Sequence, residues 1–128
     1  MSLLTALDIN ASGLTAQRQR AEVTSTNIAN SQTTRTPEGG PYRRKDVVFQ
    51  SMLQGVEVSD IVDDQTAFDR RYEPGHPDAD PQGYVNYPNV DPMQEMANLV
   101  EASRTYDANI SAMNILKTMI SKTLELGK

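Results

Sequence analysis

The C-terminal quarter of the chain contains its longest stretch that can form a single helix, from Asp91 to Leu126. Asp91 is a good N-cap, Pro92 suits the first helical position, and Gln94 has the spacing of a capping-box partner. Neither glycine nor proline follows Pro92 until Gly127. At about 1.5 Å per residue the segment predicts a helix roughly 50 Å long, which is longer than a small domain needs to cross its own core.

This helix carries a narrow heptad seam in place of the broad apolar stripe of an ordinary surface helix. The seam positions alternate at spacings of three and four, and seven of the nine are apolar: Met96, Leu99, Ser103, Tyr106, Ile110, Met113, Lys117, Ile120 and Leu124. Burying the seven stabilises the helix by on the order of 10 to 20 kcal/mol, whereas ordering its backbone costs about 1 to 2 kcal/mol per residue, partly offset by helical hydrogen bonds. We therefore expect the seam to need a partner helix.

The only other long helical pattern lies at the opposite end of the chain, in residues 3–30. Its predicted face is narrow and consists of Leu7, Ala11, Leu14, Ala21, Ser25 and Ile28. Ser, Thr, Asn and Gln make up 17 of the first 36 residues, and these side chains compete for backbone hydrogen bonds. Such a helix is marginal alone and forms on contact with a partner. The alternative is an ordinary polar-faced helix of a small bundle.

The middle of the chain, residues 31–91, reads as loops with short strands. Residues 31–41 are a loop by composition, and residues 46–52 and 56–61 predict a hairpin that turns at Gln54-Gly55, with a slip in register near Ser59-Asp60. Residues 70–72 and 84–86 predict two further short strands. The predicted fold is mainly α, divided as residues 1–30, 31–91 and 92–128, with two long terminal helices that pack together or against the same ends of other subunits.

Composition excludes several classes of function. The net charge is −5, and the whole excess lies in residues 31–91, where six basic side chains face eleven acidic ones. This balance argues against a nucleic-acid or anionic-membrane surface. The chain has no cysteine and is 38% hydrophobic without Trp, so disulfides and thiolate metal sites are excluded and the core is thin. No apolar run approaches the roughly 20 residues of a membrane span, so we expect a protein that is not embedded in a membrane.

The candidate chemistry is sparse. His76, the only histidine, stands near Asp78 and Asp80, but zinc-helix and calcium-loop spacings are absent, and we interpret the segment as a surface turn. One histidine and no cysteine leave little material for a nucleophile and base, so we expect no cofactor and no enzyme activity. The basic triplet Arg43-Arg44-Lys45 lacks an aromatic platform, and we predict that it contacts another protein.

Three segments together resemble the axial proteins of the bacterial flagellum. The first is residues 25–33, STNIANSQT, with two asparagines flanking an aliphatic residue. The second runs through residues 72–91, with YEPGHPDAD, GYV and PNVD. The third spans residues 95–124, with ASRTYDAN followed by Lys117 and KTL. The resemblance extends over nearly the whole chain, and the order of the segments makes it specific.

The resemblance implies a structural subunit of the flagellar rod, a helical tube that crosses the periplasm and transmits torque from motor to hook and filament. It implies that the terminal helices pair antiparallel, in a coiled-coil-like manner, and pack against other subunits. It implies as partners copies of this chain, other rod proteins, the export-gate adaptor and the MS ring.

The resemblance also bears on location and on the interface. The absence of a signal peptide by itself predicts a cytoplasmic protein, whereas the resemblance implies export by the flagellar type III apparatus without a cleaved signal. Asn27 and Asn30 would hydrogen-bond at the exit of the first helix. The expected interface comprises Leu7, Leu14, Asn27, Ile28, Asn30, Met96, Leu99, Tyr106, Ile110, Met113, Ile120 and Leu124. A cytoplasmic coiled-coil adaptor or export chaperone is the alternative.

Overall fold

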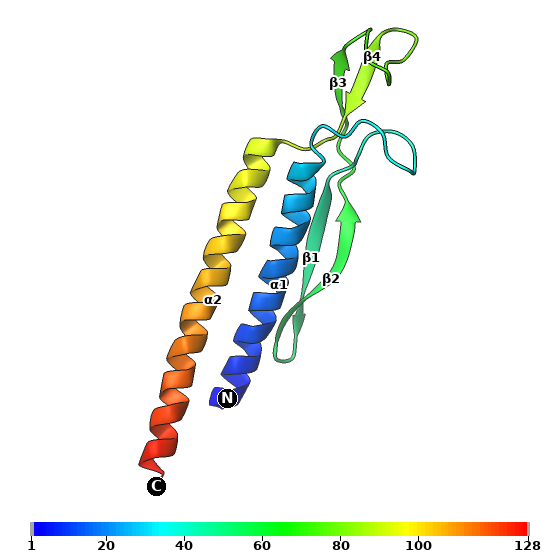
Figure 1. Ribbon diagram of the computed structural model, residues 1–128. Coiled ribbons are helices and arrows are strands. Elements are labelled where there is room, and N and C mark those ends of the chain that lie inside the picture. Colours follow the sequence, from blue (N-terminus) through cyan, green and yellow to red (C-terminus); the bar gives the residue numbers. More distant parts are fainter. Residues whose placement is uncertain (1, 128) are drawn as a thin grey trace.

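Two long helices with two small hairpins between them make up the computed structural model, which describes residues 2–127 (Figure 1). The elements are α1 (Leu3–Ala29), β1 (Lys45–Met52), β2 (Gly55–Asp63), β3 (Asp69–Tyr72), β4 (Tyr84–Tyr87) and α2 (Pro92–Leu126). This confirms both predicted helices, the predicted hairpin and the two predicted short strands. The chain is mainly α, with its β structure confined to the middle.

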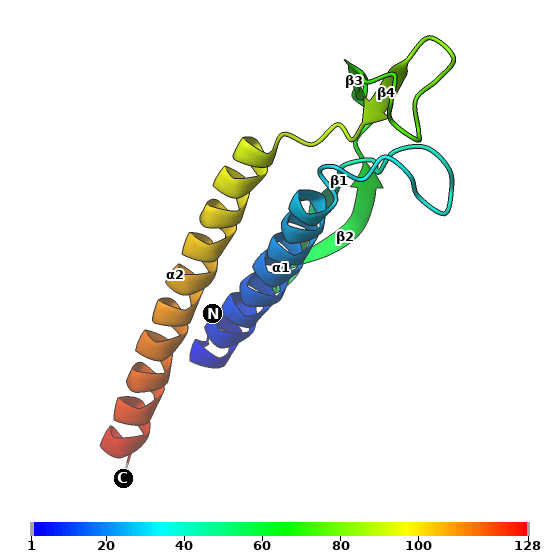
Figure 2. The same ribbon diagram turned by 45° about the horizontal axis from the view of Figure 1, so that its top comes forward.

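The two helices lie side by side and run antiparallel (Figures 1 and 2). Asn27 near the end of α1 lies beside Glu95 at the start of α2, with 3.4 Å between Asn27 Nδ2 and Glu95 Oε2. Gly13 lies farther back along α1, and a Cβ added to it would meet Asn109 Nδ2 at 3.0 Å. The antiparallel arrangement agrees with the resemblance. Since α2 is longer, its C-terminal end extends beyond the start of α1 (Figure 1).

The N-terminus of α2 is capped as the sequence predicts, with one exception. Asp91 Oδ1 accepts a hydrogen bond from Met93 N at 3.1 Å, and Pro92 occupies the first turn. The predicted capping box is wrong, because Gln94 Nε2 donates to Asn98 Oδ1 at 3.4 Å. Asn98 lies one turn further along the same helix face, within reach of a side chain that points forward.

Small and polar side chains occupy the centre of the contact between the helices. The buried residues of α1 and α2 are Ala16, Thr24, Asn27, Glu95 and Ala102. Alanines at this position let the two helix backbones approach closely. At the upper end, the polar side chains of Asn27 and Glu95 are hydrogen-bonded to each other and to their neighbours. None of the large apolar side chains of the predicted seam is buried: they are half-buried or exposed.

The β1–β2 hairpin packs along α1, and α1 lies between it and α2 (Figures 1 and 2). Val48 pairs with Asp60 and Phe49 with Val58, so Ser59 is the extra residue of a bulge. Ser59 Oγ donates to Val48 O at 3.2 Å. The predicted slip in register is therefore confirmed.

The β3–β4 hairpin stands apart from the helix pair, above its upper end (Figure 1). Val85 and Tyr87 are buried in it, and the guanidinium of Arg71 lies 4.2 Å from the centre of the Tyr87 ring. Within residues 2–127, only four hydrophobic residues are buried, these two together with Ala16 and Ala102. The protein thus has two small cores, neither of which encloses a large aliphatic side chain other than Val85.

Candidate assembly interface

A polar junction, formed by Asn27, Tyr42, Arg44, Glu95 and Asn89, joins the helix pair to the middle of the chain. Asn27 is buried at the end of α1 and binds the backbone of Lys45, with its Nδ2 donating to Lys45 O at 2.8 Å and its Oδ1 accepting from Lys45 N at 3.0 Å. The hydroxyl of Tyr42 donates to the same Oδ1 at 2.8 Å. The amide of Asn27 therefore acts as a strand partner for the first residue of β1.

Glu95 places a buried carboxylate in this junction, and Arg44 neutralises it. Glu95 is 1% exposed, and Arg44 Nε donates a hydrogen bond to its Oε1. Burial alone would lower the pKa of Arg44, but the hydrogen bond and the charge of Glu95, together with Asp46, outweigh burial and raise it. Burial raises the pKa of Tyr42, which keeps its hydroxyl protonated as a donor. A buried carboxylate of this kind is tolerated only when paired.

Asn89 extends the junction to the segment that follows β2. Its Oδ1 accepts from Arg44 N at 2.7 Å, and its Nδ2 donates to Asp64 O at 3.0 Å. Arg44 Nη1 lies 3.4 Å from Asp64 Oδ2. The ends of both helices, the start of β1 and the segment after β2 are thus tied together by side chains.

All three side chains of the basic triplet 43–45, which we predict to contact another protein, are engaged within the chain. Arg44 binds Glu95, the Arg43 guanidinium lies 4.2 Å from the centre of the Phe68 ring, and Lys45 Nζ lies 2.6 Å from Asp63 Oδ1. The acidic partners are distant in sequence, so the sequence pattern around the triplet did not reveal them.

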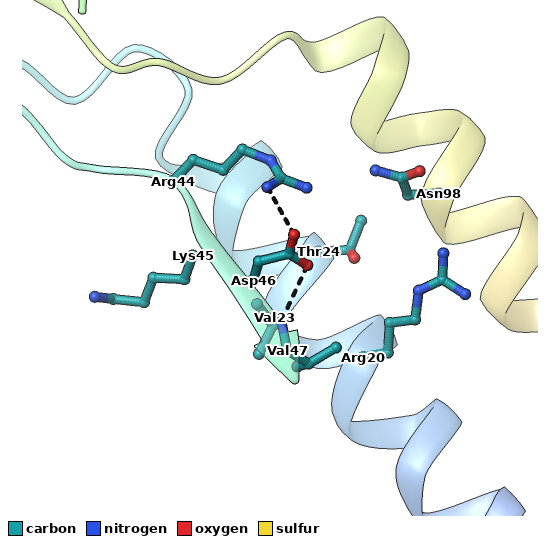
Figure 3. A pocket seen from close by; sticks show the side chains of 8 residues that line it. All are labelled: Arg20, Val23, Thr24, Arg44, Lys45, Asp46, Val47 and Asn98. Carbon is teal, nitrogen blue, oxygen red and sulfur yellow. Dashed lines mark hydrogen bonds and ion pairs between the residues drawn. The ribbon is translucent and has the colours of Figure 1, made fainter. Parts of the chain in front are cut away.

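Beside the junction lies a polar cavity of about 180 Å³ between α1, the start of β1 and α2 (Figure 3). Arg20 and Arg44 flank it, but each is already paired, Arg20 Nη2 with Glu101 at 3.3 Å and Arg44 Nη1 with Asp46 at 3.3 Å. The third cation of the lining, Lys45, is paired with Asp63, so the cavity belongs to the junction and offers no uncompensated positive charge to a ligand.

The predicted interface residues of α1 lie along one side of the helix and at its C-terminal end. Leu7, Leu14 and Ile28 are half-buried, whereas Asn27 is buried in the junction. Asn30 Nδ2 donates to Thr26 O at 2.9 Å, which satisfies one of the carbonyls freed where the helix ends. Ala11 and Ser25, which the sequence placed on the same face, are exposed.

The predicted seam of α2 divides into two rows. One row is half-buried beside α1 and consists of Leu99, Tyr106, Met113 and Ile120. The other row is exposed and repeats every seven residues: Met96, Ser103, Ile110, Lys117 and Leu124. Met96 is 50% exposed, Ile110 37% and Leu124 66%. Between the helices, a mainly apolar groove of about 250 Å³ is bordered by Ala21 and Tyr106.

Sequence reasoning missed the residues at the centre of the helix pair. Ala16 and Ala102 are too small to register in an apolar periodicity, and Glu95 is charged. The only sign of a role for Glu95 in the sequence is its position in the first turn of α2, where its negative charge interacts favourably with the helix dipole. Its burial depends on Arg44, whose approach the sequence does not reveal.

The His76 segment forms a turn held by its own side chains. His76 Nδ1 accepts from Asp78 N at 2.9 Å, and Thr34 Oγ1 donates to Asp78 Oδ2 at 2.7 Å. The hydrogen bond from Thr34 holds the pKa of Asp78 below its usual range, and backbone N–H groups, that of Tyr84 first, do the same for Asp80. Among residues 2–127, no group of three or more acidic, histidine or cysteine side chains could hold a metal ion.

Neither α1 nor α2 has an apolar stretch long enough to cross a membrane.

The paired terminal helices correspond to two known families of sequence. Residues 7–35 match the family described as flagella basal body rod protein, and residues 82–126 match the family described as flagellar basal body rod FlgEFG protein C-terminal. The first match covers most of α1, and the second covers β4 and all of α2. These matches define the class of the chain, a rod protein of the flagellar basal body.

Full-length relatives specify the family. The chain is 46% identical to the flagellar basal-body rod protein FlgC of Escherichia coli O6:H1 and 43% identical to that of Bacillus subtilis, in both cases over 100% of each chain. It is 38% identical to FlgC of Borreliella burgdorferi over 98% of each chain. The chain belongs to the FlgC family of flagellar basal-body rod proteins.

This membership settles the functional class. The chain is a structural subunit of the flagellar rod, and it is not an enzyme. The family assignment favours a rod subunit over a reversible adaptor or export chaperone.

Proposed function

We propose that the chain assembles into the rod through its terminal helices, residues 1–30 and 92–128, with residues 31–91 outside them. The observation that carries the proposal is the exposed row of α2, in which Met96, Ile110 and Leu124 project from a helix already packed on α1. Helices of neighbouring subunits would cover this row and complete a coiled-coil-like contact. The result would be a helical tube stiff enough to transmit torque.

The same pattern on α1 supports the proposal. Leu4, Ala11, Arg18 and Ser25 are exposed at heptad spacing, and Leu7 and Leu14 are half-buried beside them. Each helix thus offers one row to its partner in the chain and one row outward. A third helix would bury both outward rows at once. This burial would stabilise the contact by about 25 cal/mol for each Å² of apolar surface.

The charge distribution suits an array of many copies. Residues 1–30 and 92–128 each sum to zero, and the net charge of −5 belongs to the middle of the chain. Neutral helices pack side by side without accumulating repulsion as copies are added. The acidic middle would face water or other parts of neighbouring subunits.

The partners in this proposal are copies of the chain, other rod proteins, and the export-gate adaptor and MS ring at the base. The subunit would reach the periplasm through the flagellar type III apparatus without a cleaved signal. The polar composition of α1 supports this route, because a helix that is marginal alone can pass a narrow channel unfolded and gain order from its neighbours.

Cysteine labelling tests the proposal, because the chain has no native cysteine. Ile110→Cys places a thiol in the exposed row of α2, and Gln82→Cys places one in the exposed loop before β4. We expect Ile110→Cys to react with a maleimide in the soluble subunit and to resist it in purified basal bodies, while Gln82→Cys reacts in both. Full reactivity of Ile110→Cys in basal bodies would contradict the proposal.

A further inference from the structure

The β1–β2 hairpin has apolar side chains on both faces. Val47 and Val58, on the face toward α1, are half-buried. Val48 and Val62, which lie on the opposite face by strand alternation, are 42% and 39% exposed. A hairpin with one face in water alternates apolar and polar residues, whereas valines on both faces are typical of strands covered on both sides. The outer face of this hairpin therefore lacks a cover within the chain.

A second uncovered surface runs along the back of α2. We call it the back stripe, and its ten positions, all exposed, recur at spacings of three and four: Met93, Ala97, Val100, Arg104, Ala108, Ser111, Ile115, Met119, Lys122 and Leu126. Arg104 lies about 200° around the helix from Ala102, which is buried against α1. A shallow groove of about 310 Å³ in the stripe is lined by Ile115, Met119 and Lys122.

We propose that the outer face of the β1–β2 hairpin of one copy docks on the back stripe of α2 of a second copy. The inference rests on the proposed function in one respect, that copies of the chain meet in the same assembly. It adds a contact that the outward rows of α1 and α2 do not provide.

Charge complementarity selects this occupant. Glu57 and Asp60 lie on the outer face of the hairpin, paired across the strands with Gln50 and Val48, and neither forms an ion pair within residues 2–127. The back stripe carries the cations Arg104 and Lys122, which are also without an ion pair in that part of the chain. The acidic side chains of Glu101, Asp107 and Glu125 flank the stripe, and Glu101 is paired with Arg20. The unpaired acidic groups of the hairpin can thus meet the unpaired cations of the stripe.

The back stripe is long enough to hold the hairpin, and the distance between its two cations is close to the length of β1. The eight residues of β1 span about 26 Å at roughly 3.3 Å per residue. The helix between Arg104 and Lys122 spans about 27 Å at roughly 1.5 Å per residue. The hairpin can therefore lie along the stripe with acidic groups near a cation.

The contact has to join two copies. Within one chain, α1 separates the hairpin from α2 (Figures 1 and 2). The two surfaces are different patches of the same molecule, so each copy offers a hairpin to one neighbour and a stripe to another. Such head-to-tail contacts propagate into rings or helical arrays.

Crosslinking between two differently tagged copies tests this contact directly. One copy carries Val48→Cys or Val62→Cys on the hairpin, the other carries Ile115→Cys on α2, and both replace the native protein in flagellated cells. We expect oxidation of purified basal bodies to give a product containing both tags. The control pair, Val48→Cys with Glu22→Cys on the exposed side of α1, should give none. Basal bodies that contain both copies without the product, or whose hairpin thiols link to a different rod protein, would overturn the inference.

Charge reversal provides a second measurement. Asp60→Lys and Lys122→Glu should each reduce swarming, because each sets like charges against each other across the contact. The double variant should recover most of the loss, and a double variant no better than the singles would refute the contact. If the hairpin variants behave as wild type while Ile110→Cys is protected in basal bodies, the inference fails and the proposed function stands.

Discussion

Asn27 shows how a single side chain couples helix to hairpin. Its amide binds both the N–H and the C=O of Lys45, and its Oδ1 also accepts from Tyr42. Asn27→Ala leaves these groups unpaired, so we expect a loss of about 1 to 3 kcal/mol in the stability of the junction. The measurement is the amount of the variant in purified basal bodies, together with swarming.

Asn30→Ala is the matched control for this change. The Asn30 amide binds Thr26 O in its own helix end, where water can replace it. We expect a clearly smaller effect than that of Asn27→Ala. Equal effects of the two substitutions would mean that the junction does not depend on the bonds to Lys45.

Gly55 allows the hairpin to approach α1. Its φ is +130°, and an added Cβ would lie 2.1 Å from Ser12 Oγ, which itself accepts from Val56 N at 3.1 Å. Gly55→Ala should therefore push the hairpin tip off α1 and break that bond, since the new Cβ would also lie 2.9 Å from Ser12 Cβ, so that rotating the Ser12 hydroxyl does not relieve the clash. We expect faster proteolysis within residues 45–63 and reduced swarming. Gly75→Ala, with nothing within 4 Å, should behave as wild type, and a protease-resistant Gly55→Ala hairpin would contradict this account.

At the scale of elements, the sequence predicts what depends on local chemistry. Asp91 and Pro92 mark the start of α2, and the slip at Ser59 follows from the position of valines on either side. What it does not predict is which side of each helix meets the other. The large residues of the seam suggested Leu99 and Ile110 together, but the contact is centred on Ala102, and the two rows separate. Contacts between residues that are distant in sequence, such as Arg44 and Glu95, determine which side of each helix faces the other. Such contacts produce no periodic pattern in the sequence.

The exposed row of α2 gives the third prediction. Ile110 is 37% exposed, so Ile110→Asp costs the isolated chain little, yet in the assembly it would place an unpaired charge under a neighbouring helix. We expect the variant to be exported but absent from basal bodies, with swarming abolished. Gln94→Glu adds the same charge in the first turn of α2, where the helix dipole favours it, and should leave swarming unchanged. Normal swarming of Ile110→Asp would count against the row as an interface.

At the scale of the whole molecule, the chain buries little apolar surface, and we expect it to need neighbours to be stable. Four hydrophobic residues are buried among residues 2–127, and two of them are alanines. The end of α2 that extends beyond α1 packs against nothing in the chain, and Leu124 and Leu126 are 66% and 88% exposed there. Since a domain of about this length normally buries around two thirds of its surface, we expect other subunits to bury more of these helices.

Because so few side chains are buried within the chain, we expect the purified subunit in dilute buffer to be largely unfolded at its ends. α1 has a polar composition and few buried side chains, so it should not persist without partners. We expect circular dichroism to report much less helix than α1 and α2 contain, and brief proteolysis to remove both termini while the β3–β4 hairpin, with buried Val85 and Tyr87, survives longest. The same digestion of purified basal bodies should leave both helices intact, because neighbouring subunits then cover their outward rows. A monomer that melts cooperatively with both helices protected would show that the intrachain contacts suffice, and the exposed rows would then need another explanation.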